Sequence, residues 1–386
     1  MNNTSDTNKT KGNGLKKKLV LLALIVFIAV AVIGGLRYYD IKTRNAVEEL
    51  AAEKKMINIL LAGSNNYQKR KFDFFAILSI NPDNNNIGVT FIPPSFRVNM
   101  NARGNDPKRI DEVDFIYFDR LRASFNRDLN IPIQFYIQLY ASETGRIVDL
   151  LEGIDIFYLD QYGCDVFMKP GLNYLDGEKI MRYINTVEEN SIYLKYDRIM
   201  DILLTLYYNR SNKLGFLNMD FIAAAIESNF TNLLPKELLS LSKFLADEGE
   251  LIYTILPGAF ENDYYITDDI AYKIYEKDFL GKLVMGAEDE AIPKIKILNA
   301  TDISGLARKV RNTLNMEGYN VVEFSTSPYG KMNKSVIISK KGDSAFVKQI
   351  SELTGIPTVY YIIDNSLLYN TLIILGEDMA NGEYAQ

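Results

Sequence analysis

The longest uninterrupted apolar stretch in the chain runs from Leu19 to Leu36 and contains no charged residue. As a helix it would span about 27 Å, close to the roughly 30 Å of a bilayer's hydrocarbon core. Lysines precede it at 16–18 and tyrosines follow it at 38–39. The positive-inside rule therefore predicts a single-pass membrane helix with a cytoplasmic N-terminus and an extracellular C-terminal part. The alternative is a cleaved signal peptide, whose apolar region is usually only about 7–15 residues long.

The residues on either side of this stretch predict a tail and a stalk. Residues 1–18 are rich in Asn, Thr, Ser and Lys, which is typical of disorder, and they form the predicted cytoplasmic tail. Residues 37–56 form the predicted helical stalk, because 44–55 are rich in helix formers and carry glutamates that can pair with later lysines.

From residue 57 to 285, short apolar runs bounded by turn signals alternate with amphipathic segments. The runs predict buried strands, and apolar spacings of three and four predict helices. A helix at 142–152, capped by Ser142, lies between strands at 135–139 and 154–159, and this unit predicts an α/β sandwich. The polar residues 101–112 predict a loop. The other predicted strands are 57–63, 74–80 and 88–92, and the other predicted helices are 117–129, 177–184, 194–207 and 219–246.

A second compact pattern follows residues 286–293, which are polar, end in proline and predict a linker. The remaining residues, 294–386, predict a small α+β domain. Its predicted strands are 294–298, 320–324, 335–339, 358–362 and 371–375, and its predicted helices are 304–316 and 343–353.

Composition excludes several kinds of chemistry. The chain has no histidine and one cysteine, Cys164, so a Ser-His-Asp triad, a histidine-based zinc site and an intrachain disulfide are impossible. Catalysis would have to use carboxylates, Lys, Arg, Tyr or Ser, with or without an oxygen-ligated metal. The formal net charge is −6, of which residues 1–18 contribute +4, so residues 37–386 carry −10. Such an acidic body is unsuited to nucleic acid, which requires a basic surface.

Several segments of the outer part resemble the LytR-CpsA-Psr family of bacterial envelope proteins. They are the strand 58–64, the second strand with its turn at 73–82, the segments 131–136 and 148–155, and the stretch from Pro170 to Tyr183. Residues 294–377 resemble the family's optional C-terminal domain, with Leu298–Thr301 and Ser304–Ala307 as the local signature.

The resemblance implies an α/β fold with an N-terminal transmembrane helix, a sandwich ectodomain at 57–285 and the small α+β domain at 294–386. Proteins of this family bind polyprenyl-phosphate-linked glycans and transfer the glycan-phosphate to peptidoglycan or another wall acceptor. A pyrophosphate requires arginines as bidentate donors and Mg²⁺ held by carboxylates. The implied partners are a polyprenyl-(pyro)phosphate lipid or glycolipid, peptidoglycan or wall-assembly proteins, and the membrane through Leu19 to Leu36, with no nucleic acid.

The family's functional positions are only partly retained. Its Arg-Ser-Asp-Thr corresponds to residues 71–74 here, which keep the metal-type Asp73 but place Lys71 at the arginine. Its Ile-Pro-Arg-Asp corresponds to residues 92–95, where proline and serine replace the arginine and the aspartate. A lysine cannot reproduce the planar fork of an arginine. By resemblance or proximity, the catalytic candidates are Asp73 and Arg198, the phosphate-binding candidates are Lys71, Arg97, Arg109 and Lys195, and the metal candidate is Asp73.

Two functions remain open on these residues. The first is a binding or scaffold protein of envelope assembly that handles polyprenyl-phosphate-linked glycopolymers with impaired catalysis, and the lost arginines and aspartate favour it. The second is an active Mg²⁺-dependent glycopolymer-phosphate transferase, which the retained Asp73 and the retained scaffold favour. A third function, transcriptional regulation, is disfavoured by the extracellular location and the acidic body.

Overall fold

The computed structural model describes residues 45–64, 72–101, 106–159, 168–185, 192–209, 230–247, 249–286 and 292–381. The chain divides into two compact units, residues 1–49 and 50–386. The predicted stalk helix corresponds to α2 (Ala46–Ala52). The predicted tail and membrane helix lie outside the described residues. Within the described ranges, no helix is long and apolar enough to cross a membrane.

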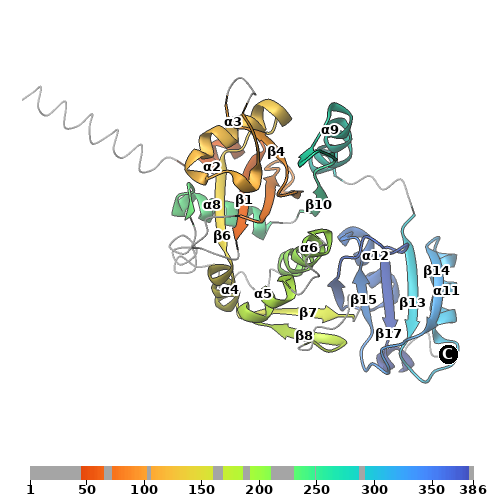
Figure 1. Cartoon of the computed structure of the whole chain (residues 1–386). Coiled ribbons are helices and arrows are strands. Elements are labelled where there is room, and N and C mark those ends of the chain that lie inside the picture. Colours follow the sequence, from red (N-terminus) through yellow and green to blue (C-terminus); the bar gives the residue numbers. More distant parts are fainter. Residues whose placement is uncertain are drawn as a thin grey trace, which may run out of the picture. The chain divides into compact units, whose positions relative to one another are not determined.

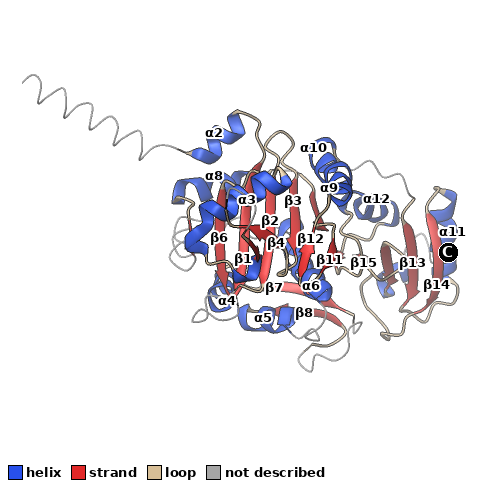
Figure 2. Cartoon of the chain, turned by 45° about the horizontal axis from the view of Figure 1, so that its top comes forward, coloured by secondary structure: helices blue, strands red, loops and turns tan. Residues whose placement is uncertain are grey.

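The larger unit begins with a six-stranded mixed sheet (Figures 1 and 2). The strand order is β10-β3-β2-β1-β6-β9. Strands β1, β2 and β3 are antiparallel neighbours, whereas β6 joins β1, and β10 joins β3, in parallel. The three strands predicted at the start of this part are confirmed nearly to the residue. The strands are β1 (Ile57–Ser64), β2 (Phe74–Ile80), β3 (Ile87–Ile92), β6 (Phe135–Tyr140), β9 (Phe230–Thr231) and β10 (Leu251–Ile255).

Helices cover both faces of this sheet, as the nearly continuous burial of its central strands requires. On one face, Phe75 and Ile77 share a core cluster with Phe125 of α3 (Phe118–Leu129) and with Phe279. Phe279 belongs to a helical segment made of α9 (Asp269–Tyr275), the π-helical η6 (Glu276–Leu280) and α10 (Gly281–Met285). Side chains alternate along a strand, so Phe91 faces the other way and stacks on α6 (Ile192–Tyr208).

The elements of the predicted strand–helix–strand unit are confirmed, but its two strands do not pair with each other. Strand β7 (Ile154–Tyr158) does not join β6 after α4 (Ala141–Leu150) but pairs antiparallel with β8 (Gly171–Leu175), which the sequence pattern did not predict. The two strands form a separate ribbon that packs against α6. Its inward side chains, Ile154 and Ile156, join a core with Tyr183 of α5 (Gly177–Asn185) rather than with the large sheet.

Further predictions for 57–285 are corrected. The residue before α4 is Tyr140, which makes no side-chain cap, so Ser142 lies inside the helix rather than at its cap. The polar segment 101–112 contributes a strand and a 3-10 turn. Of the predicted helix 219–246, only α8 (Pro235–Ala246) is described, and Phe230–Thr231 is a strand. Further elements without a prediction are β4 (Arg97–Asn99), β5 (Pro107–Arg109), η2 (Ile110–Glu112), η3 (Phe115–Tyr117), β10 (Leu251–Ile255), β11 (Ala259–Glu261), β12 (Tyr264–Ile266), α9 (Asp269–Tyr275), η6 (Glu276–Leu280) and α10 (Gly281–Met285).

A five-stranded sheet occupies the C-terminal part, with the order β14-β13-β17-β15-β16 (Figure 1). Every strand and helix predicted there is confirmed. Asp343 caps the second helix by accepting a hydrogen bond from the Phe346 amide at 2.9 Å. The elements are β13 (Lys294–Asn299), α11 (Leu306–Met316), β14 (Asn320–Thr326), β15 (Val336–Ser339), α12 (Ser344–Thr354), β16 (Val359–Tyr361), β17 (Thr371–Leu375) and η7 (Glu377–Asn381).

Candidate functional site

Asp73 and Lys195 form an ion pair at the start of β2. The Asp73 amide donates to the Gly63 carbonyl at 3.0 Å, which places its carboxylate beside the end of β1. Its Oδ2 lies 3.6 Å from Nζ of Lys195, which extends from the first turn of α6. The Asp73 side chain is 53% exposed and that of Lys195 is 22% exposed. Solvent therefore reaches both charges, and a ligand can compete for either.

An aromatic stack fixes α6 at this position. Tyr196 lies 4.4 Å from Phe91 between ring centroids, at 11° between the planes, and Phe74 meets both rings edge-on. The Tyr196 hydroxyl donates to the Ile92 carbonyl at 3.1 Å. Burial raises the pKa of this phenol, which therefore stays protonated as a donor. The neighbouring Lys195 is held beside Asp73 by this packing.

Arg97 and Arg109 lie opposite each other on the β4–β5 ribbon. The Arg109 guanidinium makes two hydrogen bonds to Asp111, at 3.0 and 2.6 Å, and these raise its pKa. The Asp111 amide donates to the Pro94 carbonyl at 3.2 Å, so the ribbon is joined to the segment that replaces the family's arginine and aspartate. Arg97 is exposed. The ribbon thus offers one solvent-facing guanidinium and one engaged by its own carboxylate.

Arg198 lies in the interior, although it is on the same helix as Lys195. Only 3% of the residue is exposed. Its guanidinium carbon lies 4.3 Å from the centroid of the Tyr183 ring, and Nη1 donates to the Tyr183 carbonyl at 3.1 Å. Arg198 therefore joins α6 to α5 and does not face solvent with Lys195.

The predicted site residues thus divide into separate groups. Asp73 and Lys195 meet, Arg97 and Arg109 meet on the ribbon, Arg198 is internal, and Lys71 lies outside the described residues. No group of three or more acidic or cysteine side chains suited to a metal occurs in the described ranges. The carboxylate of Asp73 faces an ammonium group instead. These residues do not fit a protein-made Mg²⁺ site, which needs several oxygen ligands.

Sequence reasoning missed a buried charged cluster on α6. Asp201 is 1% exposed, and its carboxylate accepts from the Tyr183 hydroxyl at 2.6 Å and from the Ile363 amide at 2.5 Å. Lys340, at the end of β15, is fully buried. Burial raises the pKa of Asp201 and lowers that of Lys340. The available signal was two aspartates four residues apart in a helix whose other charged residues are Lys195 and Arg198.

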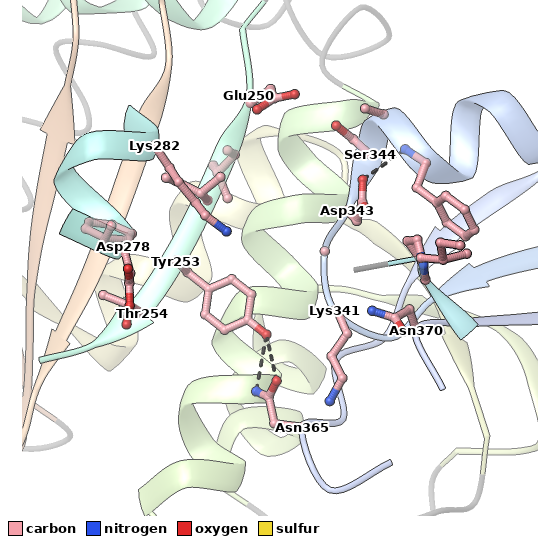
Figure 3. Close-up of a pocket in the computed structure, with 18 of the residues that line it drawn as sticks. Glu250, Tyr253, Thr254, Asp278, Lys282, Lys341, Asp343, Ser344, Asn365 and Asn370 are labelled. Carbon is pink, nitrogen blue, oxygen red and sulfur yellow. Dashed lines mark hydrogen bonds between the residues drawn. The ribbon is translucent and has the colours of Figure 1, made fainter. Parts of the chain in front are cut away.

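The neighbouring Asp197 is also buried. Its Oδ1 accepts from the Asn365 amide at 2.9 Å, and burial raises its pKa to about 6. Asn365 in turn donates to the Tyr253 hydroxyl of β10 at 3.2 Å (Figure 3). These bonds join α6, β10 and the C-terminal sheet at one point.

A cleft of about 1040 Å³ opens beside this point, between β10 and the first turn of α12 (Figure 3). A smaller cleft of about 440 Å³ lies between the β7–β8 ribbon and β16. None of the predicted site residues lines either cleft. The candidate phosphate-binding groups are therefore on a different part of the molecule from both clefts.

The chain matches known proteins in two of its parts. A family model described as LytR cell envelope-related transcriptional attenuator matches residues 293–378. Curated relatives include proteins named polyisoprenyl-teichoic acid–peptidoglycan teichoic acid transferase TagU. The one from Bacillus cereus is 26% identical over 162 residues, which are 36% of this chain and 53% of that protein. The one from Bacillus mycoides is 25% identical over the same shares. The chain thus spans about half the length of these relatives.

Solved structures give a similar result. The crystal structure of B. subtilis TagV is 19% identical, with a TM-score of 0.49 over 60% of this chain and 98% of that chain. The structure of TagT bound to LIIa-WTA is 18% identical, with a TM-score of 0.49 over 60% of this chain and 91% of that chain.

The chain carries an α/β domain followed by a C-terminal α+β domain. Its C-terminal part matches the LytR family model, and the chain is similar to curated transferases, so it resembles the LytR-CpsA-Psr family. The predicted resemblance is therefore confirmed. The relatives' printed names place this family among cell-wall glycopolymer transferases.

Proposed function

We propose that this protein binds a polyprenyl-phosphate-linked glycopolymer at Lys195 and Asp73 and contributes to envelope assembly by binding or scaffolding, with impaired transfer. The relatives' names supply the ligand class, a polyisoprenyl-linked teichoic acid with peptidoglycan as acceptor. In this proposal Lys195 contacts phosphate, while Arg97, Arg109 and Lys71 are phosphate-binding candidates from the sequence alone.

The observation that carries the proposal is the position of Arg198. A phosphate-binding arginine must present its planar fork to the ligand. Arg198 is buried, lies over the Tyr183 ring and donates to a backbone carbonyl. Its helix partner Lys195 is a point charge that can attract a phosphate but cannot bind it in a bidentate manner. Binding is therefore supported more strongly than transition-state stabilisation.

The alternative function is active transfer, and the exposed carboxylate of Asp73 favours it. In that case Mg²⁺ would be held by Asp73 together with oxygens of the substrate phosphates. The metal would neutralise charge on the pyrophosphate, while Lys195 would hold the departing prenyl phosphate.

The test uses the full chain in detergent micelles and a prenyl-pyrophosphate-linked disaccharide with Mg²⁺. We expect saturable binding of the lipid without release of prenyl phosphate above the protein-free background. Lys195→Met should abolish most of the binding, whereas Lys331→Met, on an exposed ion pair elsewhere, should leave it unchanged. Absence of binding by the wild-type chain contradicts the proposal, and metal-dependent release establishes the alternative.

We further propose that Leu19 to Leu36 anchors the protein in the cell membrane with its C-terminal part outside. The charge pattern around this stretch supports the orientation. Alkaline carbonate extraction should leave the full chain in the membrane, and protease added to intact cells should remove residues 50–386. Release by carbonate, or protection from the protease, would contradict the topology.

A further inference from the structure

The C-terminal domain packs directly on α6. Ile180 and Ile202 share one buried cluster with Ile338 and Ile374 of the C-terminal sheet. Tyr208, at the end of α6, stacks on Tyr361 with 4.6 Å between ring centroids. This contact buries apolar surface from both partners, which is the usual source of a stable association.

A second stack joins the same two parts away from α6. Phe157 of β7 lies 5.1 Å from Tyr360 of β16 between ring centroids, at 28° between the planes. The C-terminal domain therefore holds α6 together with the ribbon on which α6 rests.

The charged residues of α6 lie on different sides of the helix. At about 100° per residue, Asp197 and Asp201 are rotated about 200° and about 240° from Lys195. The distances agree with this geometry, because Lys195 meets Asp73 whereas the aspartates meet the C-terminal domain. A single rigid helix therefore carries the candidate headgroup contact on one face and the interdomain contact on the other.

The interdomain contact is a polar cluster to which α5, α6, β10 and the C-terminal domain all contribute side chains or backbone groups. Asp201 bonds to a side chain of α5 and to an amide of the C-terminal domain, and Lys341 Nζ donates to the Asp364 carbonyl at 3.1 Å. A buried cluster of this kind strongly favours one arrangement, because a shift leaves polar groups unsatisfied. The titratable and charged groups that face one another are Tyr183, Asp197, Asp201, Tyr253, Lys340, Lys341 and Asp364.

We propose that Asp197 and Asp201 are positioning residues that fix α6 to the C-terminal domain and so set where Lys195 meets Asp73. The C-terminal domain then acts as an intramolecular support of the headgroup site, and it need not contact the lipid. The inference deepens the proposed function and rests on it for the identity of the ligand, but its mechanical part is independent of any ligand.

The mechanical part is tested by hydrogen–deuterium exchange on the full chain in detergent micelles. Asp201→Asn leaves one acceptor oxygen where the structure uses two, and Asn365→Ala removes the donor to Asp197. We expect amides at 192–196, on the far side from the lost contact, to exchange at least tenfold faster in both variants. Tyr275→Phe is the matched control, because it removes a buried hydroxyl bonded to Thr90 at 2.9 Å and unconnected to α6.

Unchanged exchange at 192–196 overturns the inference: with the interface open, α6 would hold its position without that contact, and with the interface closed, the substituted residues would not be fixing α6. The chain has no tryptophan, so Tyr360→Trp introduced into each variant reports interface opening through the emission of a single tryptophan. Equal exchange in the control and the Asp201→Asn variant overturns it as well, because the effect would then be general destabilisation.

The effect on the site is measured with farnesyl pyrophosphate as a soluble prenyl-pyrophosphate probe. Asp201→Asn should weaken its binding about tenfold, and this factor should vanish in a Lys195→Met background, since the residue acts through Lys195. The same factor in both backgrounds overturns the inference. If the wild-type chain does not bind the probe, the proposed function fails, while the exchange experiment still decides the positioning role.

Discussion

Two aspartate–lysine sites on opposite faces of α6 use the same residue types for different purposes. Asp73 and Lys195 are partly exposed and 3.6 Å apart, so water screens the attraction between their charges. Asp201 and Lys340 are buried. Each has lost the hydration of its charge, and neighbouring polar groups must offset that loss. The comparison teaches that exposure, and not residue type, separates a group available to a ligand from a group that joins two domains.

The buried site should dominate stability. Lys340→Met removes a buried ammonium group that interacts electrostatically with Asp201 and Asp364, and it should lower the free energy of unfolding by about 3 kcal/mol. The matched change Lys331→Met breaks the exposed pair with Asp302 and should leave the free energy of unfolding unchanged. Urea titration of the full chain measures both. Equal midpoints for the two variants would show that burial does not distinguish the two kinds of site.

The stability contributed by the buried carboxyls should also depend on pH, and it should increase as the pH falls. The pKa of Asp197 is raised to about 6, so the folded protein binds this proton more tightly than the unfolded chain. Stability from this group is fully present below its ordinary pKa and is lost as pH rises through about 6. Titration of this group as the pH is lowered from 7 to 5 should therefore stabilise the protein by about 1 kcal/mol. Asp201, with its raised pKa, contributes in the same direction.

Thermal or urea unfolding at the two pH values checks this sign, with Asp197→Asn as the matched variant. In this variant the free energy of unfolding should differ clearly less between pH 7 and pH 5 than it does in the wild-type chain. Greater stability of the wild-type chain at pH 7 than at pH 5 would contradict the assigned role of the buried carboxyls.

A backbone feature of the interface should produce an intermediate effect. Gly342 has φ of 82°, and a Cβ there would lie 3.3 Å from Leu204 of α6. Gly342→Ala should cost about 2 kcal/mol, part of it from the left-handed backbone and part from the contact. Gly355 has φ of 69° and open space around it, so Gly355→Ala should cost about 1 kcal/mol from the backbone alone. If urea titration shows the same loss in the free energy of unfolding for both variants, α6 shifts to accommodate the new methyl group at this contact.

The exposed site should affect stability least and binding most. Lys195→Met or Asp73→Asn should change the free energy of unfolding by less than about 0.5 kcal/mol. Lys195→Met should weaken prenyl-pyrophosphate binding at least tenfold, which calorimetry measures directly. A large loss of stability without a loss of affinity would reverse the roles assigned to the two faces.

Much of the fold could be predicted because local signals were strong. The strands at 57–63 and 74–80 are apolar runs bounded by turns, and Asp343 marks the start of α12 as its cap. Pairing could not be predicted in the same way. Strand β7 follows α4 as a parallel partner of β6 would, but its partner β8 is set by packing against α6. Short strands such as β4 and β5 carry too few apolar positions to show a period.

The sequence predicted which residues belong to the candidate site but not how they are arranged. Resemblance identified Asp73 and Lys195, which do meet, but it gave no indication that Arg198 would be internal, since that depends on the Tyr183 ring from another helix. The importance of Asp201 was equally hidden, because its partners lie 18 and 162 residues away along the chain. Contacts of this range are determined by tertiary packing, and no local pattern encodes them.

The most direct measurement is the release of prenyl phosphate from a prenyl-pyrophosphate-linked disaccharide by the full chain in micelles with Mg²⁺. It compares the wild-type chain with the P94R/S95D variant, which restores the family's Ile-Pro-Arg-Asp at residues 92–95. We predict that the wild-type chain binds the lipid and releases no prenyl phosphate above background, whereas the variant shows measurable release. Release by the wild-type chain that depends on Mg²⁺ and is lost in Asp73→Asn would contradict a binding or scaffolding function.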